Sequence, residues 1–410
     1  MSDYRSMDWL VGHAIDILNF YYPTCVDSVH GGFIAQLDAE TGDVYDADSK
    51  HVVATARFTT NFWRGFQLFD RDWVKRAESV DPRLTPAELR EQTRRGVDSL
   101  RTAFRDDTHE GFHWLLRGRT PVESRRVCYG HAFVLLALAR GKQVSIPDAH
   151  DGFVDARTVM RDRFYETDSG LYHSEFDTTW SEAAAYRGQN ASMHVCEALL
   201  ASYEATGETA LLARARRLAR QLCVELAEET DGRLWEHYTA GWNHDFDYNR
   251  DTPADQFRPW GYQPGHHVEW AKLLAVLHRY LAEPPGWLLP RAIELYEYAV
   301  ESGWDDTHGG FYYTLADDGE PVVDDKYGWP VAEAIGAAAA LYERTGTDAY
   351  LADYDRFWRY AETTLTAPAG NWYERVSTEG IPYPTDEGPT VEPGYHPLGA
   401  CFEALRSLHG

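Results

Sequence analysis

The sequence predicts an all-α protein, an (α/α)6 barrel (a toroid) whose helices are connected by short β-hairpins. Three observations predict this fold: a recurring glycine-aromatic phrase, an alternation of buried and amphipathic helix candidates, and the lack of a Pro/Gly/Ser-rich linker between them. Together they indicate a single domain over residues 1–410.

The hairpins are predicted from a phrase that the chain repeats. HGGF stands at residue 30 and again at residue 308, and variants follow as HEGFHWLL at 109, DSGLYHSEFD at 168, DGRLWEHY at 231 and GNWYERVSTEG at 370. Each copy combines a glycine, which can take a left-handed turn, with alternating aromatic and polar residues, the pattern of a short hairpin. Six copies, spaced by roughly 60 to 80 residues, indicate six modules.

Helix candidates of two kinds lie between these phrases. Six are rich in Ala and Leu with little charge through their middle, which predicts burial on most sides, and they begin near residues 56, 129, 190, 264, 329 and 395. More polar, arginine-bearing helices, such as those from residues 84, 209 and 287, fit a solvent-facing outer layer. Six such pairs favour a closed ring over an open solenoid, because an open array needs polar capping repeats at its ends.

The charge balance excludes several partners. The chain carries 65 acidic and 39 basic residues, a formal net charge of −26, which repels nucleic acid and anionic lipid. Arginine supplies nearly all the positive charge, because only five residues are lysine. This pattern resembles proteins of salt-loving organisms, where high ionic strength screens the self-repulsion; the alternative is an ordinary acidic cytosolic enzyme.

We expect a cytoplasmic protein, as a monomer or homodimer, without a membrane partner. No apolar run approaches the roughly 18 residues of a membrane span, and the N-terminus lacks the pattern of a signal peptide. The cysteines are scattered and never spaced as CxxC, so neither a disulfide framework nor a zinc ribbon is indicated. We expect most of them to be buried: Cys25, Cys128, Cys196, Cys223 and Cys401.

Polar residues stand at the start of each predicted buried helix. In a toroid the inner helices run parallel, so these starts gather at one mouth and line one pocket. In QPGHHVEW and EPGYHPLG a Pro-Gly pair leads to His266 and His396 at a helix N-terminus, where the helix dipole disfavours imidazolium and keeps the base neutral. Glu269 follows His266 on the same face and can orient its ring or hold a sugar hydroxyl, and Arg57 supplies a strong cation.

Metal and phosphate chemistry is not favoured. His194 with Glu197, and His266 with Glu269, have the i,i+3 spacing of chelating pairs, but di-metal bundles use Glu-x-x-His, and no HExxH occurs. Neither GxGxxG nor GxxxxGK[ST] is present. We therefore expect no metal and no cofactor.

The chain resembles the N-acylglucosamine 2-epimerase superfamily over nearly its whole length. The resemblance rests on Arg57 and the ordered motifs NxxMHxxEA from Asn190, PGHxxEW from Pro264, WPxAEA from Trp329 and GYH ending at His396. It implies an (α/α)6 barrel that isomerises or epimerises a monosaccharide without a metal. The spellings GHHVEWAK, with Lys272 in place of a tryptophan, and YGHAF, from Tyr129, are more similar to the aldose-ketose isomerase branch.

That resemblance implies a reaction between D-mannose, or a related aldose, and D-fructose through an enediol. It assigns His396 the proton transfer from C2 to C1, and His266 ring opening and proton exchange with the oxygens, supported by Glu269. Arg57 and His194 would stabilise the enediolate. Hydroxyl and ring contacts are expected from Tyr129, Asn190, Arg258, Trp329 and Glu333.

Three other functions stay open. A sugar 2-epimerase, acting on an N-acylglucosamine or between mannose and glucose, would return the proton to the opposite face of C2. A glycoside hydrolase would need two carboxylates facing the scissile bond, and a sugar- or protein-binding module would leave solvent deuterium out of the sugar. The sugar itself is also open, since Arg258 can serve a neutral hydroxyl or a sulfonate; Glu197 and Glu333 are open between structural bonds and substrate contact.

Overall fold

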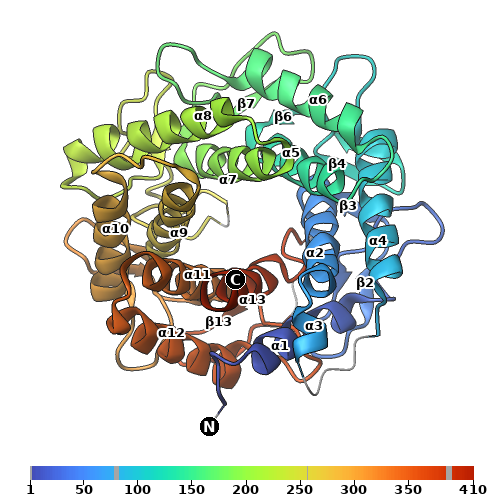
Figure 1. Cartoon of the computed structure of the whole chain (residues 1–410). Helices are drawn as coiled ribbons and strands as arrows, with labels where there is room; N and C mark the ends of the chain where they lie inside the picture. Colours follow the sequence, from blue (N-terminus) through green and yellow to red (C-terminus); the bar gives the residue numbers. More distant parts are fainter. Residues whose placement is uncertain (1, 78–82, 256, 385–389) are drawn as a thin grey trace.

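A computed structural model describes residues 2–77, 83–255, 257–384 and 390–410. Its helices form two concentric rings (Figure 1), and the predicted (α/α)6 barrel is confirmed. Within the described residues the inner ring consists of α2 (Val52–Asp70), α5 (Cys128–Gln143), α7 (Gln189–Thr206), α9 (Pro264–Tyr280), α11 (Gly328–Thr345) and α13 (Tyr395–His409).

The outer ring covers the inner one with amphipathic helices. It consists of α1 (Met7–Tyr21), α4 (Pro86–Ser99), α6 (Ala149–Val159), α8 (Thr209–Arg220), α10 (Leu288–Gly303) and α12 (Asp348–Tyr360). The first helix, α1, packs against the last, α13, so the two ends of the chain close the ring (Figure 1).

Short helical segments complete the outer layer. The α3 turn (Trp73–Arg76) follows α2, and five-residue π-helical segments extend α4, α6, α8 and α12 at η1 (Leu100–Phe104), η2 (Met160–Phe164), η3 (Gln221–Glu225) and η5 (Ala361–Leu365). A 3₁₀ segment, η4 (Leu226–Thr230), follows η3.

Composition explains which helices lie inside. In α11 every residue from Pro330 to Leu341 is buried, and half of them are Ala, which lets α9 and α13 pack closely on its two sides. The outer α8 instead has one apolar stripe and an arginine-rich face. The five cysteines are buried and unpaired, as predicted.

The predicted hairpins lie at one end of the barrel and connect neighbouring modules. The pairs within hairpins are β1 (Gln36–Leu37) with β2 (Val44–Asp46), β4 (Leu115–Arg117) with β5 (Thr120–Glu123), and β10 (Thr314–Leu315) with β11 (Pro321–Val323). Strands that precede an inner helix pair antiparallel with the next module: β3 (Ser49–His51) with β4, β6 (Arg126–Val127) with β7 (Glu175–Phe176), β8 (Arg187–Gly188) with β9 (His237–Tyr238), and β12 (Lys326–Tyr327) with β13 (Arg375–Val376).

The repeated HGGF phrase has a structural role. In both copies a preceding aspartate, Asp27 or Asp305, accepts two turn N–H groups through Oδ1. Its Oδ2 atom binds a buried lysine just before an inner helix: Lys50 at 2.5 Å and Lys326 at 3.0 Å, respectively. The phrase thus fixes a turn to the strand that leads into the neighbouring inner helix.

No helix among the described residues is long and apolar enough to cross a bilayer.

Candidate active site

A cavity of about 840 Å³ opens where the inner helices begin. All of the predicted site residues except Arg258 and Glu333 line it. They come from all six inner helices: Arg57 from α2, Tyr129 from α5, Asn190 and His194 from α7, His266 and Glu269 from α9, Trp329 from α11, and His396 from α13. The expected gathering of helix starts at one mouth therefore brings these side chains together.

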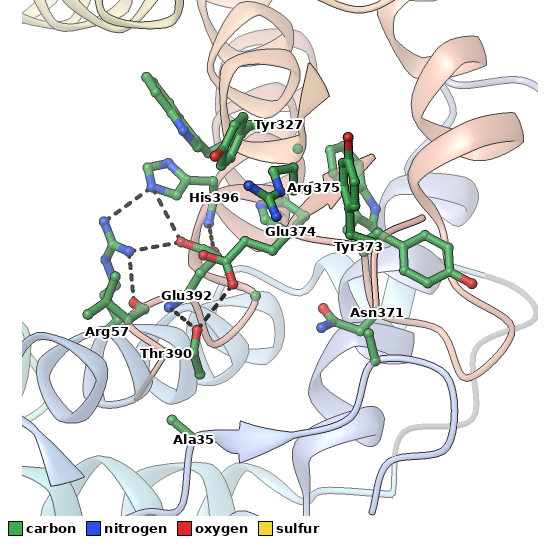
Figure 2. A pocket seen from close by; sticks show the side chains of 18 of the residues that line it. Ala35, Arg57, Tyr327, Asn371, Tyr373, Glu374, Arg375, Thr390, Glu392 and His396 are labelled. Carbon is green, nitrogen blue, oxygen red and sulfur yellow. Dashed lines mark hydrogen bonds and ion pairs between the residues drawn. The ribbon is translucent and has the colours of Figure 1, made fainter. Parts of the chain in front are cut away.

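His396 is fixed on both ring nitrogens. Its Nδ1 atom lies 2.8 Å from Glu333 Oε1, so it donates a hydrogen bond to that carboxylate. Its Nε2 atom accepts from the Arg57 guanidinium at 3.2 Å (Figure 2). These bonds select the neutral tautomer whose Nε2 lone pair is directed to the Arg57 side of the cavity, the form that a general base requires.

His266 has its own buried carboxylate. Its Nδ1 atom lies 2.9 Å from both oxygens of Glu236, and the Gln189 amide also donates to that carboxylate, at 2.9 and 3.1 Å. Burial alone would raise the pKa of Glu236, but its contacts with His266 and Gln189 lower it. Glu236, rather than Glu269, therefore orients the His266 ring, which corrects one of the two roles considered for Glu269.

Trp329 lies against both imidazoles. Its ring centroid is 5.1 Å from that of His266 and 5.9 Å from that of His396. Gly265 permits this packing, because a Cβ atom there would lie 2.4 Å from the Trp329 ring. The two histidines therefore face one shared space across an aromatic wall.

The two Pro-Gly pairs place their histidines in different ways. Pro264 and Gly265 are already in the first turn of α9. Gly394 precedes α13 with a φ of +66°, a conformation that strongly favours glycine, and it turns the chain so that His396 enters the helix near its first residue.

Arg57 is the buried cation of the cavity wall. Its guanidinium donates to the Val391 carbonyl at 2.8 Å, to Glu392 at 2.9 Å and to the Tyr129 hydroxyl at 3.0 Å, besides His396. Figure 2 shows Arg57, Glu392 and His396 meeting at one point of the wall. A negative oxygen formed beside His396 would lie next to this positive charge.

His194 lies with two carboxylates from its own helix and α9. Its Nδ1 atom is 3.0 Å from Glu197 and 3.9 Å from Glu269. Burial lowers the pKa of His194 to about 4, so the ring is neutral near pH 7. Burial, followed by repulsion from Glu333, raises the pKa of Glu269 well above its ordinary value. The pairing of Glu197 with His194 favours a structural role for this second glutamate.

Among the described residues, a potential metal site is formed by His194, Glu197 and Glu269, whose ligand atoms lie within 4.8 Å of one another. Two cations, Lys272 and Arg57, bear on the same carboxylates electrostatically and oppose a further positive ion. The proton transfers discussed below use imidazoles and do not require a metal.

Two predicted contacts lie outside the cavity wall. The Arg258 guanidinium donates to Tyr248 at 2.9 Å and Glu175 at 3.3 Å and stacks on Tyr186, so its charge is already used in the loop before α9. Glu333 bonds His396 Nδ1 and does not line the cavity. Position in the sequence places a residue near the mouth but does not say which way it points.

Sequence reasoning missed several residues of the site. Glu236 comes from the hairpin phrase DGRLWEHY and reaches His266 because β8 and β9 pair. Glu392, four residues before His396, accepts from its backbone N–H at 3.1 Å. Glu374 lies on the same side of the cavity (Figure 2). No periodic pattern in the sequence marks these carboxylates.

Comparisons with known proteins agree with this geometry. The profile of the family described as N-acylglucosamine 2-epimerase (GlcNAc 2-epimerase) matches residues 32–400. A D-mannose isomerase of Marinomonas mediterranea is 35% identical over 407 residues, covering 99% of this chain and 98% of the relative. One from Thermobifida fusca is 39% identical over 292 residues, 70% of this chain and 72% of that protein. A crystal structure of a D-mannose isomerase superposes with a TM-score of 0.91, at 34% identity and 99% coverage of both chains.

Proposed function

Because this chain belongs to the N-acylglucosamine 2-epimerase family and is an aldose-ketose isomerase, we propose that its substrate is D-mannose, which it converts reversibly to D-fructose. The observation that carries the proposal is the pair of imidazoles on one cavity, each with Nδ1 held by a buried carboxylate. Such a pair presents two Nε2 atoms to one small molecule, which proton transfer along a sugar chain needs.

In the proposed reaction Arg57 transfers its hydrogen bond from His396 Nε2 to a sugar oxygen, which frees the Nε2 lone pair to remove the proton from C2 of the open-chain aldose. The electron pair of that C–H bond forms the C1=C2 double bond of an enediolate, and the aldehyde electrons move to O1. His396 then returns the proton to C1 while the O2–H bond breaks and C2 becomes a carbonyl. His266 opens the sugar ring and exchanges protons with O1 and O2.

Arg57 and His194 support the intermediate in this proposal. The Arg57 guanidinium already donates to His396 Nε2 and Tyr129, so its positive charge lies where O1 or O2 becomes negative. Preorganised charge of this kind stabilises the transition state without a reorganisation cost. Neutral His194 can donate or accept one hydrogen bond, depending on its tautomer.

Sugar hydroxyls find unused hydrogen-bonding groups on the wall. The buried side-chain oxygens of Asn190, Gln263 and Asn371 have no hydrogen-bond partner among the described residues, although all three residues line the cavity. A buried polar atom without a partner is costly, and a bound hydroxyl would remove that cost. This supports a polyhydroxylated ligand.

The charges of the wall support a neutral sugar over a sulfonated or phosphorylated one. Carboxylates outnumber cations there, and both lining arginines lie next to an acid: Arg57 beside Glu392 at 2.9 Å and Arg375 beside Asp325 at 3.9 Å. Arg258, considered above for a sulfonate, is engaged elsewhere. A sulfonate or phosphate group on the substrate would therefore be repelled.

The test is an incubation with D-mannose in deuterated buffer, at low and high salt, followed by NMR. We expect D-fructose as the product, with solvent deuterium at C1 to the extent that the His396 proton exchanges with water. Formation of D-glucose with deuterium at C2 would instead establish a 2-epimerase. Parallel incubations with N-acetylglucosamine and sulfoquinovose are expected to show no turnover.

A further inference from the structure

The partly buried ammonium of Lys272 is connected to His396 through the Glu333 carboxylate, across three inner helices. Lys272 of α9 contacts Glu333 Oε2, and Glu333 of α11 accepts from His396 Nδ1 through its other oxygen, at 2.8 Å. We propose that Lys272 is a positioning residue, which keeps Glu333 anionic and thereby keeps His396 in the tautomer that accepts a proton. This inference rests on the proposed function, because it assumes that His396 is the base.

Glu333 needs a cation because it shares its surroundings with other carboxylates. Glu269 and Glu197 act on the same buried region, and two anions this close to each other in a buried site favour protonation of one. The structure shows which one is favoured. The pKa of Glu333, which burial alone would raise, is lowered to about 2, chiefly by Lys272, whereas that of Glu269 is raised by burial and by Glu333.

The charge state of Glu333 decides the tautomer of His396. An anionic Glu333 can only accept, so Nδ1 must carry the hydrogen and Nε2 keeps its lone pair. A protonated Glu333 could donate to Nδ1 instead, which would place the ring hydrogen on Nε2 and remove the base from the cavity side. Lys272 therefore acts on the reaction without touching the sugar.

The packing leaves room for the lysine. Gly336 follows Glu333 by one turn in α11, and a Cβ atom at that position would lie 3.1 Å from Lys272 Cδ. Glycine inside a helix costs about 1 kcal/mol relative to alanine, so its presence there suits a site where space is needed. The aliphatic stem of Lys272 passes over this gap.

Other charged groups facing Glu333 and His396 set the background for any pH effect. They lie on α2, α7, α9 and α13 and in the segment before α13: Arg57, His194, Glu197, Glu269, Glu392 and Glu403. Glu392 touches His396 Nε2 at 3.4 Å, and Glu403 is paired with Arg279, so Lys272 is the cation in contact with Glu333 in the described structure.

The test compares Lys272→Met with Lys272→Arg. We expect Lys272→Met to lower kcat on D-mannose by roughly tenfold or more with a smaller change in KM. The tautomer shift lowers the fraction of His396 that can accept a proton but leaves the contacts that bind the sugar unchanged. The acid limb of kcat/KM should move to higher pH, since Glu333 takes up a proton more readily. Lys272→Arg, which keeps the positive charge, should retain most of the wild-type kcat and the wild-type pH profile. Wild-type values of kcat and pH profile in Lys272→Met would overturn the proposal.

Two further measurements separate this role from simple structural support. Lys50→Met breaks a matched buried lysine pair, with Asp27, outside the cavity; we expect lower thermal stability with an unchanged pH profile. In a double-mutant cycle, Lys272→Met added to Glu333→Gln should cost little more than Glu333→Gln alone, because both act through one carboxylate. Fully multiplicative losses would contradict the proposal.

A measurement that needs no substrate tests the role of Lys272 separately from the identity of the sugar. Nitrogen NMR of labelled His396 should report the Nδ1–H tautomer in the wild-type protein and a growing Nε2–H or mixed population in Lys272→Met. If the wild-type protein did not convert D-mannose but this shift was seen, the substrate would be wrong and the positioning role would stand. An unchanged tautomer would refute the positioning role alone.

Discussion

His266 and His396 reach the cavity from the first turns of two inner helices, and their surroundings are alike. Each donates from Nδ1 to a carboxylate that is itself buried, Glu236 or Glu333. Glu236 comes from the hairpin before α9, and Glu333 comes from the neighbouring inner helix α11. These carboxylates hold the hydrogen on Nδ1 and so leave Nε2 as the reactive nitrogen, through contacts that α9 and α13 do not provide by themselves.

The first residue-scale prediction concerns these histidines. We expect His396→Ala and His266→Ala each to lower kcat on D-mannose by about 10²- to 10⁴-fold, the range for loss of a general acid or base. Circular dichroism and the melting temperature should stay close to the wild-type values. His131→Ala serves as a contrast: this histidine bonds Val127 and the Phe112 N–H in the scaffold, so its loss should lower stability more than chemistry.

A second prediction concerns Glu236, which sequence reasoning did not find. Glu236→Gln keeps the shape of the side chain but removes the charge that holds the Nδ1 hydrogen of His266. We expect kcat to fall roughly 10²-fold while KM changes little. Steady-state kinetics with D-mannose measures kcat and KM of this variant. Glu175→Gln, outside the cavity wall, serves as the control. Equal activity of the two variants would mean that Glu236 does not act on His266.

What the sequence allowed at this scale follows from helix geometry. His266, His396 and Arg57 were predictable because they stand at the starts of helices that must run parallel. Glu236 was not, because a two-residue strand pairing carries it to His266 and such a pairing leaves no periodic signal. Arg258 does not line the cavity, because a loop residue near the mouth can turn toward Tyr248 and Glu175 as easily as toward the cavity.

At the scale of elements, the hairpins are what hold neighbouring modules in register. Four strands that precede an inner helix, β3, β6, β8 and β12, pair with a strand of the next hairpin. An acid in the turn before each of these strands binds its basic residue: Asp27 with Lys50, Asp106 with Arg126, Glu166 with Arg187, and Asp305 with Lys326. The repetition of the phrase was visible in the sequence, but its basic partner lies about 20 residues further on. That distance hid the ion pair until the fold was known.

This arrangement predicts that Asp305 stabilises the barrel. Asp305→Asn keeps an oxygen for the two turn N–H groups at Thr307 and His308 but leaves Lys326 buried without its counter-ion. We expect a loss of roughly 3 kcal/mol in the free energy of unfolding, the usual cost of breaking a buried pair. Urea unfolding in 1 M KCl measures it, and there Asp306→Asn, at the exposed neighbour, should be near neutral because surface repulsion is screened.

The pH dependence of this pair follows from its sign. The pKa of Asp305, which burial alone would raise, is lowered to about 2, first by its hydrogen bond with Lys326, so the folded protein holds the carboxylate charged more strongly than the unfolded chain does. The stabilisation is therefore complete above about pH 4, the ordinary aspartate value, and is lost as the pH falls through about 2. Asp305→Asn should flatten this part of the stability curve.

At the scale of the whole molecule, the net charge of −26 makes the protein a strong polyanion. The exposed excess of acid repels itself in the folded state more than in the expanded unfolded chain, which destabilises the fold at low ionic strength. Salt shortens the range of that repulsion from about 10 Å at 0.1 M to about 3 Å at 1 M. Stability should therefore rise with salt.

We expect the melting temperature to increase by several degrees between 0.1 and 1 M KCl, and activity on D-mannose to persist there. Scanning calorimetry over a KCl series measures the first effect. Because salting-out strengthens any hydrophobic core, the control is a variant with less surface charge, Asp107→Asn combined with Asp306→Asn at two strongly exposed positions. If screening is the cause, that variant is more stable at 0.1 M and gains less from added salt. If the melting temperatures of the two proteins rise in parallel with KCl concentration, salting-out is the cause, and repulsion between the acidic surface groups does not lower stability.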